Sequence, residues 1–156
     1  MEAPKQVDAT RPDDYLEVLS RVVFATGISG DVVDRKWPGI REAMHDFDAE
    51  RLANLSPDEL DKLSIDTRVI RNRRKLEGIV ANAQTVLALE KEHGSFRNYL
   101  KSLGSFESAE KDLKKRFKFV GDYGAFHFLY VVKEPVPDWH DWCRSHGREH
   151  LLAGQH

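Results

Sequence analysis

Residues 111–132 read KDLKKRFKFVGDYGAFHFLYVV, a basic run that leads into a glycine turn and then into apolar sequence. The basic run meets Phe117-Lys118-Phe119-Val120-Gly121, and the apolar run begins at Ala125. Glycine permits a tight turn, and a helix that follows it opens with unpaired backbone N–H groups that suit an anion. The stretch therefore predicts a backbone-cradled phosphate, and a nucleic-acid backbone is the natural candidate partner.

The length and composition of the whole chain predict one ordinary globular domain. It has 156 residues, of which 40% are hydrophobic and 32% charged. No apolar stretch reaches the length of a membrane span, and the N-terminus lacks the apolar segment of a secretory signal. We therefore expect a cytoplasmic monomer without membrane contact. Cys143 is the only cysteine, which excludes an intrachain disulfide, an all-cysteine zinc site and a four-cysteine iron–sulfur cluster, and we expect no cofactor.

Charge is distributed unevenly along the chain, although the net charge is only −2. Residues 1–66 carry 15 acids and 8 bases, whereas residues 67–156 carry 11 acids and 16 bases. Two basic clusters lie in the second part, Arg68 to Lys75 and Lys111 to Lys118. Salt screens charges over about 10 Å, so the local charge of each cluster, and not the net charge of the chain, decides whether a polyanion binds there. The alternative interpretation is that both clusters are solvated helix faces.

Helical periodicity runs through almost the whole chain and predicts an all-α fold. Leu76, Ile79, Val80, Ala83 and Leu87 form one face of a long helix. Ser56 and Glu59 predict a capping box with Pro57 at the first helical position. We expect one compact multi-helix domain over residues 1–156, with residues 1–12 and 147–156 as loose ends. Further helices are expected at 13–26, 39–45, 48–54, 95–103, 108–116, 124–132 and 138–145.

Three blocks of this sequence resemble the DNA-3-methyladenine glycosylase I family, within the helix-hairpin-helix glycosylase superfamily. The first runs from Phe47-Asp48 through residues 69–76, VIRNRRKL, to Asn82-Ala83, similar to the family's Ile-Ile-Arg-x-Arg-x-Lys-Ile and Asn-Ala. The second, residues 113–121, is similar to Leu-Lys-Lys-Arg-Gly-Phe-x-Phe-Val-Gly but one glycine short. The third, residues 25–29, resembles Ala-Gly-Leu-Ser. Together they span roughly residues 15–140.

The resemblance implies an α-helical fold with a helix-hairpin-helix motif, in which the hairpin at 119–124 binds the backbone of double-stranded DNA. It also implies a pocket that receives a flipped-out damaged base. We expect phosphate contacts from Arg73, Arg74, Lys115 and Lys118 of the two basic clusters. The other expected DNA-binding residues belong to the hairpin and are Gly121, Tyr123 and Gly124. Arg73 and Arg74 have the alternative of capping or pairing within the first block. Asp122 opposes phosphate binding, so binding should be strongly salt-dependent.

Two positions of the implied base pocket depart from the family. The family's pocket carboxylate falls on Val22, and the aromatic residue after its serine falls on Gly30. The aromatic residues available to stack on a base are Phe24, Trp37 and Tyr123, each with the alternative of core or hairpin packing. The implied pocket therefore comprises Val22, Phe24, Gly30 and Trp37.

A metal site of the family type is not expected, because the N-terminal Cys and His of the family's structural zinc are absent. His140, Cys143, His146 and His150 would share a face if their helix continued, but one helix rarely completes a tetrahedral site. His127, within the apolar run, reads as a core histidine. The prediction is that no metal binds.

Asp138 is the candidate catalytic residue. Cleavage of an N-glycosidic bond develops positive charge on the sugar, so a carboxylate beside C1′ or one that activates water assists it. Asp138 lies 17 residues after Gly121, about where the wider superfamily carries its catalytic Asp. The alternative is that Asp138 is the N-cap of the next helix.

Three functional hypotheses follow. The first is a base-excision-repair N-glycosylase that flips an alkylated purine such as 3-methyladenine out of DNA and releases it. An alkylated purine is cationic and leaves readily, so loss of the pocket Glu does not by itself exclude activity. The second is an inactive paralogue that binds DNA but has lost the base-recognition Glu and Trp. The third is a protein whose basic clusters serve solubility alone.

Overall fold

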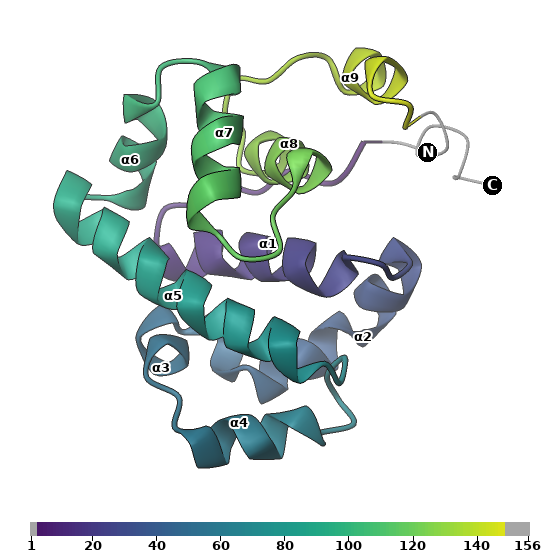
Figure 1. The fold of residues 1–156 in the computed structure, drawn as a ribbon, viewed down its shortest axis with the longest axis vertical. Coiled ribbons are helices and arrows are strands. Elements are labelled where there is room, and N and C mark those ends of the chain that lie inside the picture. The colour runs from purple at the N-terminus through teal and green to yellow at the C-terminus, as the bar shows by residue number, and fades with distance from the viewer. Residues whose placement is uncertain (1–2, 149–156) are drawn as a thin grey trace.

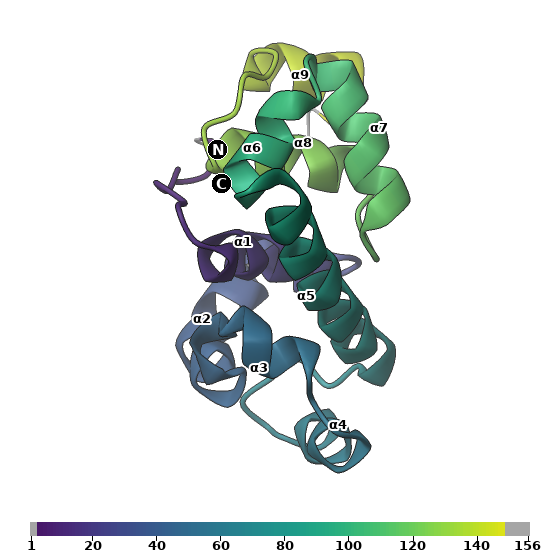
Figure 2. The ribbon, with the colours of Figure 1, turned by 90° about the vertical axis from the view of Figure 1, so that its left-hand side faces the viewer.

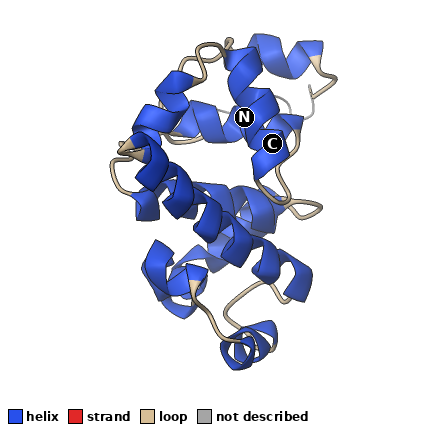
Figure 3. Cartoon of the chain, turned by 60° about the vertical axis from the view of Figure 1, so that its left-hand side comes forward, coloured by secondary structure: helices blue, strands red, loops and turns tan. Residues whose placement is uncertain are grey.

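The computed structural model describes residues 3–148, and these residues are helical without any strand (Figure 3). The helices are α1 (Pro12–Ala25), α2 (Gly30–Ala43), the short 3-10 helix η1 (His45–Phe47), α3 (Ala49–Ala53), α4 (Pro57–Ser64), α5 (Arg73–His93), α6 (Phe96–Ser102), α7 (Phe106–Arg116), α8 (Asp122–Val131) and α9 (Trp139–Ser145). The all-α prediction is confirmed. No helix within the described range is long and apolar enough to cross a membrane.

Helices α1 and α5 form the centre of the molecule, and the others lie on either side of them. Figures 1 and 2 show α2, α3 and α4 on one side and α6 to α9 on the other. Helix α5 packs on α1, α3, α4 and α6, while α1 also packs on α8. The chain therefore builds two helical groups against a shared central pair.

The hydrophobic core is correspondingly divided into two large clusters. One gathers buried side chains of α1, the C-terminal half of α5, α6, α7 and α8, and the other those of α1, α2, α3 and the N-terminal half of α5. Successive positions of a helix point about 100° apart, so α1 contributes different residues to each cluster. A smaller aromatic cluster joins α8 to α9 through Phe126, Trp139 and Trp142.

Helix α2 begins earlier than expected. It starts at Gly30, where the Ser29 side chain accepts a hydrogen bond from the Asp31 N–H at 3.2 Å, and it continues through Pro38. The predicted start at Gly39 was wrong because Pro38-Gly39 looks like a helix break. The polypeptide then turns at η1, where three residues have positive φ, and Phe47 stacks on Trp37 with ring centroids 5.2 Å apart.

The segment before α1 is not loose over the residues described. Ala9 is buried, the Val7 N–H donates to the Val131 carbonyl at 2.8 Å, and the Gln6 side chain donates to the Tyr130 carbonyl at 2.9 Å. Residues 3–11 therefore lie against the end of α8. The expected loose C-terminal end lies outside the described residues from position 149 onward.

Lys75 joins the two central helices. Its side chain is buried, and the Nζ donates to the carbonyl oxygens of Phe24 at 3.2 Å and Thr26 at 2.7 Å, at the C-terminus of α1. Burial lowers the pKa of Lys75 below its usual value. Helix C-termini carry unpaired carbonyls and partial negative charge, so a lysine from α5 is a suitable cap there.

Candidate nucleic-acid interface

The loop between α7 and α8, residues 117–121, forms a hairpin that is fixed to α5. The buried amide of Asn82 donates to the Lys118 carbonyl at 3.2 Å and accepts from the Lys118 N–H at 2.8 Å. Phe119 has a φ of +62° and is 36% exposed, and its ring covers Gly78 of α5. A Cβ on Gly78 would lie 2.8 Å from that ring, so glycine permits this close approach. The hairpin is thus held in one position by α5.

The basic clusters separate into paired and unpaired cations. Arg68 pairs with Asp66 and Glu42, Arg116 with Asp112, and Arg73 with Asp61 and Glu77. Among the members of the two clusters, all of which lie in the described part of the chain, the exposed cations without an ion-pair partner are Arg71, Arg74, Lys111, Lys114, Lys115 and Lys118. The pairing alternative is therefore confirmed for Arg73, whereas Arg74, Lys115 and Lys118 are available to phosphate.

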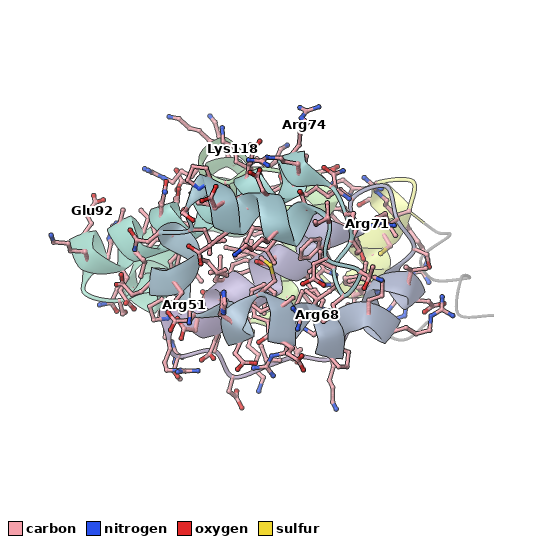
Figure 4. All side chains as sticks on the ribbon, turned by 90° about the horizontal axis from the view of Figure 1, so that it is seen from below. Arg51, Arg68, Arg71, Arg74, Glu92 and Lys118 are labelled. Carbon is pink, nitrogen blue, oxygen red and sulfur yellow. The ribbon has the colours of Figure 1, made fainter. Side chains whose placement is uncertain are left out.

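Arg74 and Lys118 lie at the same edge of the molecule, while Arg51 and Arg68 lie on the opposite side (Figure 4). A shallow depression of about 230 Å³ lies between Arg74 and Lys118. It is lined by Arg74, Glu77, Gly78, Ala81, Lys118 and Phe119. The first turn of α5 and the hairpin, separated by more than 40 residues of sequence, therefore present cations on one surface.

The other predicted hairpin residues lie at the start of α8. Gly121 is the N-cap and is exposed. Tyr123 contacts the aromatic cluster, with its ring 6.0 Å from that of Trp139 and 5.9 Å from that of Trp142. Burial, with Cys143 nearby, raises the pKa of Tyr123 to about 12. Gly124 contacts α1, since a Cβ there would lie 2.7 Å from Val22 Cγ1. Gly121 faces solvent, whereas Tyr123 and Gly124 pack against neighbouring helices.

The structure does not gather the four predicted pocket residues around one cavity. Val22 belongs to the core cluster with α8, whereas Phe24 and Trp37 belong to the cluster with α2, because residues two apart on α1 point to opposite sides. Gly30 is exposed at the start of α2. A second depression, of about 130 Å³, lies away from these four residues, between α6, α7 and the end of α8.

Polar side chains that the sequence did not indicate surround Trp37. Its indole Nε1 donates to Glu17 Oε2 at 2.8 Å, and the Arg21 guanidinium lies 4.8 Å above the ring. Arg21 also forms an ion pair with Asp34 of α2. Nothing in the sequence spacing marks this group, because Glu17, Arg21 and Asp34 meet only after the turn between α1 and α2 has formed.

His127 of α8 lies beside this group. Burial and, secondarily, the positive charge of Arg21 lower the pKa of His127 to about 4, while Asp34 opposes the shift. Its Nδ1 lies 3.4 Å from the Tyr123 hydroxyl. The imidazole is therefore neutral at physiological pH, and His127 is half-buried at the edge of the core, not within it.

Asp138 is the N-cap of α9. Its Oδ1 accepts from the Asp141 N–H at 3.0 Å, and the residue is exposed. The N-cap alternative is thus confirmed, and the catalytic role stays a prediction.

Among the described candidate metal ligands, only His140 and Cys143 belong to α9. Helix α9 ends at Ser145, so it does not continue through His146, and Cys143 is buried. His150 lies outside the described residues. Within residues 3–148, no three His, Cys, Asp or Glu side chains are placed to hold a metal ion.

Comparison with known proteins agrees with the helical fold described above. Residues 7–117 match the methyladenine glycosylase family. A DNA-3-methyladenine glycosylase of Haemophilus influenzae is 30% identical over 124 residues, which cover 66% of this chain and 67% of that protein. DNA-3-methyladenine glycosylase 1 of Escherichia coli is 27% identical over 124 residues, which cover 66% of each. The chain thus spans about two thirds of the length of these relatives.

Solved structures show the same fold. The 3-methyladenine DNA glycosylase I of Staphylococcus aureus superposes with a TM-score of 0.73 at 26% identity, covering 82% of this chain and 79% of that one. A single-residue variant of 3-methyladenine DNA glycosylase I in complex with 3-methyladenine gives a TM-score of 0.72 at 26% identity, covering 82% of this chain and 79% of its own. Since the family match covers well over half of the sequence and the fold agrees, this chain belongs to the methyladenine glycosylase family.

Proposed function

We propose that this protein is a DNA N-glycosylase that releases an alkylated purine such as 3-methyladenine from double-stranded DNA. The observation that carries the proposal is a solved relative of the same fold that holds 3-methyladenine, at a TM-score of 0.72 over 82% of this chain. The unpaired cations beside the fixed hairpin support DNA as the partner. We further propose that the protein acts as a monomer in the cytoplasm.

The hairpin and the first turn of α5 would bind the DNA backbone. Arg74 can contact phosphate oxygens in a bidentate way, and Lys118 adds a point charge next to it. Their backbone is held by α5 itself and by Asn82, so little conformational entropy is lost when DNA binds. Contacts of this kind position the duplex without reading its sequence.

Base release needs little acid catalysis from this protein once the base is extruded. A 3-methylated adenine is cationic while it is attached to the sugar, so the bond from C1′ breaks with its electron pair moving to the base, which leaves as a neutral molecule. Water then adds at C1′ and releases a proton to solvent. A carboxylate near the sugar would stabilise the positive charge that develops there. Asp138 is our candidate for that role. Its Oδ1 serves the N-cap, and Asp138 directly precedes α9, which packs on α8 through the aromatic cluster.

The decisive experiment measures release of free base from alkylated duplex DNA. Purified protein is incubated with DNA that carries radiolabelled methyl groups, and released 3-methyladenine is quantified by chromatography beside a family enzyme as the positive control. We expect multiple-turnover release. An inactive DNA-binding paralogue would instead bind the duplex and release no base, and a protein with solubility-only basic clusters would not bind at all.

A further inference from the structure

Arg148 reaches the start of α8, directly after the hairpin, through a turn at the end of α9. Gly147 has a φ of +66°, the Arg148 N–H donates to the Cys143 carbonyl at 2.6 Å, and the Gly147 N–H donates to the Arg144 carbonyl at 3.3 Å. These two bonds form a Schellman motif, with Gly147 in the left-handed position that favours glycine. The turn reverses the chain and fixes where Arg148 lies.

The Arg148 side chain contacts two residues of the first turn of α8. Its Nη2 lies 3.3 Å from Asp122 Oδ1, and its guanidinium carbon lies 5.4 Å from the centre of the Tyr123 ring. The Arg148 side chain is 36% exposed and the Asp122 side chain 43% exposed, so both face solvent as well as each other. Residues separated by 26 positions are thereby joined at the start of the second hairpin helix.

Asp122 is an obstacle to the proposed function. A carboxylate next to a bound phosphate repels it, and the two would lie well within the screening distance of about 10 Å at 0.1 M salt. The Asp122 carboxylate also accepts from the Tyr123 N–H at 2.8 Å, so it is held at the end of α8 that follows the hairpin.

We propose that Arg148 neutralises Asp122 and thereby makes the hairpin competent to bind the DNA backbone. The inference rests on the proposed function, since it concerns the same DNA interface. An exposed ion pair contributes little to the stability of a fold, so the main effect of Arg148 is on the local field and not on folding. With Arg148 the pair carries no net charge, and without it Asp122 places an uncompensated negative charge directly after the hairpin.

The test is a charge cycle measured by binding of a fluorescently labelled, undamaged duplex at low salt. Arg148→Ala should weaken binding by about three- to tenfold, because an uncompensated charge then faces the phosphates. Asp122→Asn should strengthen binding, since asparagine keeps the acceptor for the Tyr123 N–H and removes the charge. The double variant Asp122→Asn, Arg148→Ala should return to within about twofold of the unmodified protein.

The matched control is Arg144→Ala, which removes an arginine of α9 that pairs with Asp141 at 3.6 Å, and it should leave binding unchanged. Gly147→Ala, which strains the turn at positive φ and so displaces Arg148, should weaken binding in the same direction as Arg148→Ala. Thermal melting confirms that each variant is folded.

Two results would overturn the inference. Unchanged binding by a folded Arg148→Ala would show that Asp122 needs no compensation. A double variant as weak as Arg148→Ala would show that Arg148 acts by some route other than neutralising Asp122. Failure of the unmodified protein to bind DNA would instead contradict the proposed function, so the two failures are distinguishable.

Discussion

The amide of Asn82 bridges to the backbone of Lys118 in both directions, donating to its carbonyl at 3.2 Å and accepting from its N–H at 2.8 Å. One side chain of α5 thus satisfies two backbone groups of the hairpin that is expected to meet DNA. Asn82 is buried, so its truncation would leave both backbone groups without their side-chain partner.

Asn82→Ala should therefore weaken DNA binding and lower the free energy of unfolding by about 2–3 kcal/mol, since two backbone groups lose their partner. Chemical denaturation and duplex binding measure the two effects. Gln84→Ala, which removes one exposed hydrogen bond to Ala53 from the same helix, is the control and should leave DNA binding intact. Equal DNA affinity of folded Asn82→Ala would show that the hairpin position does not matter for binding.

Lys118→Glu should reduce affinity for duplex DNA by at least about tenfold at low salt. The slope of log affinity against log salt concentration should also fall by about one unit, since one fewer counterion is released. The physical reason is that an exposed cation at the hairpin becomes an anion facing phosphate. Gel shifts over a range of salt concentrations provide the measurement. Lys91→Glu makes the same charge change near the other end of α5, and an equal loss there would mean that only net charge matters.

Asp138→Asn separates catalysis from capping. Asparagine caps a helix as well as aspartate does, so the melting temperature should not change. If Asp138 stabilises positive charge on the sugar, base release should fall by about 10²-fold while DNA affinity is kept. Asp138→Ala additionally removes the cap and should lower stability by about 1 kcal/mol. If the Asp138→Asn variant releases base at the rate of the unmodified protein, Asp138 serves only as the N-cap of α9.

Lys75→Met should destabilise the protein by about 2–4 kcal/mol, because the Phe24 and Thr26 carbonyls at the end of α1 would lose a charged donor inside the protein. Methionine has a similar length and so limits the packing change. Urea denaturation measures the loss. Lys91→Met, an exposed change on the same helix, should have an effect below about 0.5 kcal/mol, and a similar loss in both variants would contradict the capping role of Lys75.

His127 should make the protein sensitive to acid. Its pKa is about 4 in the folded protein and near 6.5 when exposed, so the unfolded chain binds the proton more readily between these values. Stability is therefore fully present above about pH 6.5 and declines as the pH falls toward 4, by up to about 3 kcal/mol for this group.

Urea denaturation as a function of pH tests this. His127→Gln should flatten the decline between about pH 6.5 and 4, whereas His140→Gln, an exposed change on α9, should leave it as it is. An unchanged acid profile in His127→Gln would assign the pH dependence to other groups.

The family and the helical fold could be predicted from local patterns. The Ser56–Glu59 capping box is present with both hydrogen bonds at 3.1 Å, because its partners are three residues apart and need no distant contact. The helix face at Leu76, Ile79 and Ala83 is buried as its spacing indicates. The start of α2 was missed because tertiary packing of Val33 and Trp37 outweighs the local signal of Pro38.

Apart from the start of α2, the sequence by itself determined the positions of the helices and of the hairpin between α7 and α8, since these depend on residues within a few positions of one another. Only the tertiary structure decided that Arg73 is paired while Arg74 and Lys118 share a surface, and that Val22 and Phe24 face different cores. It also decided that Arg148 meets Asp122. These relationships join side chains from separate elements or opposite helix faces, and no local pattern encodes the packing that brings such groups together or keeps them apart.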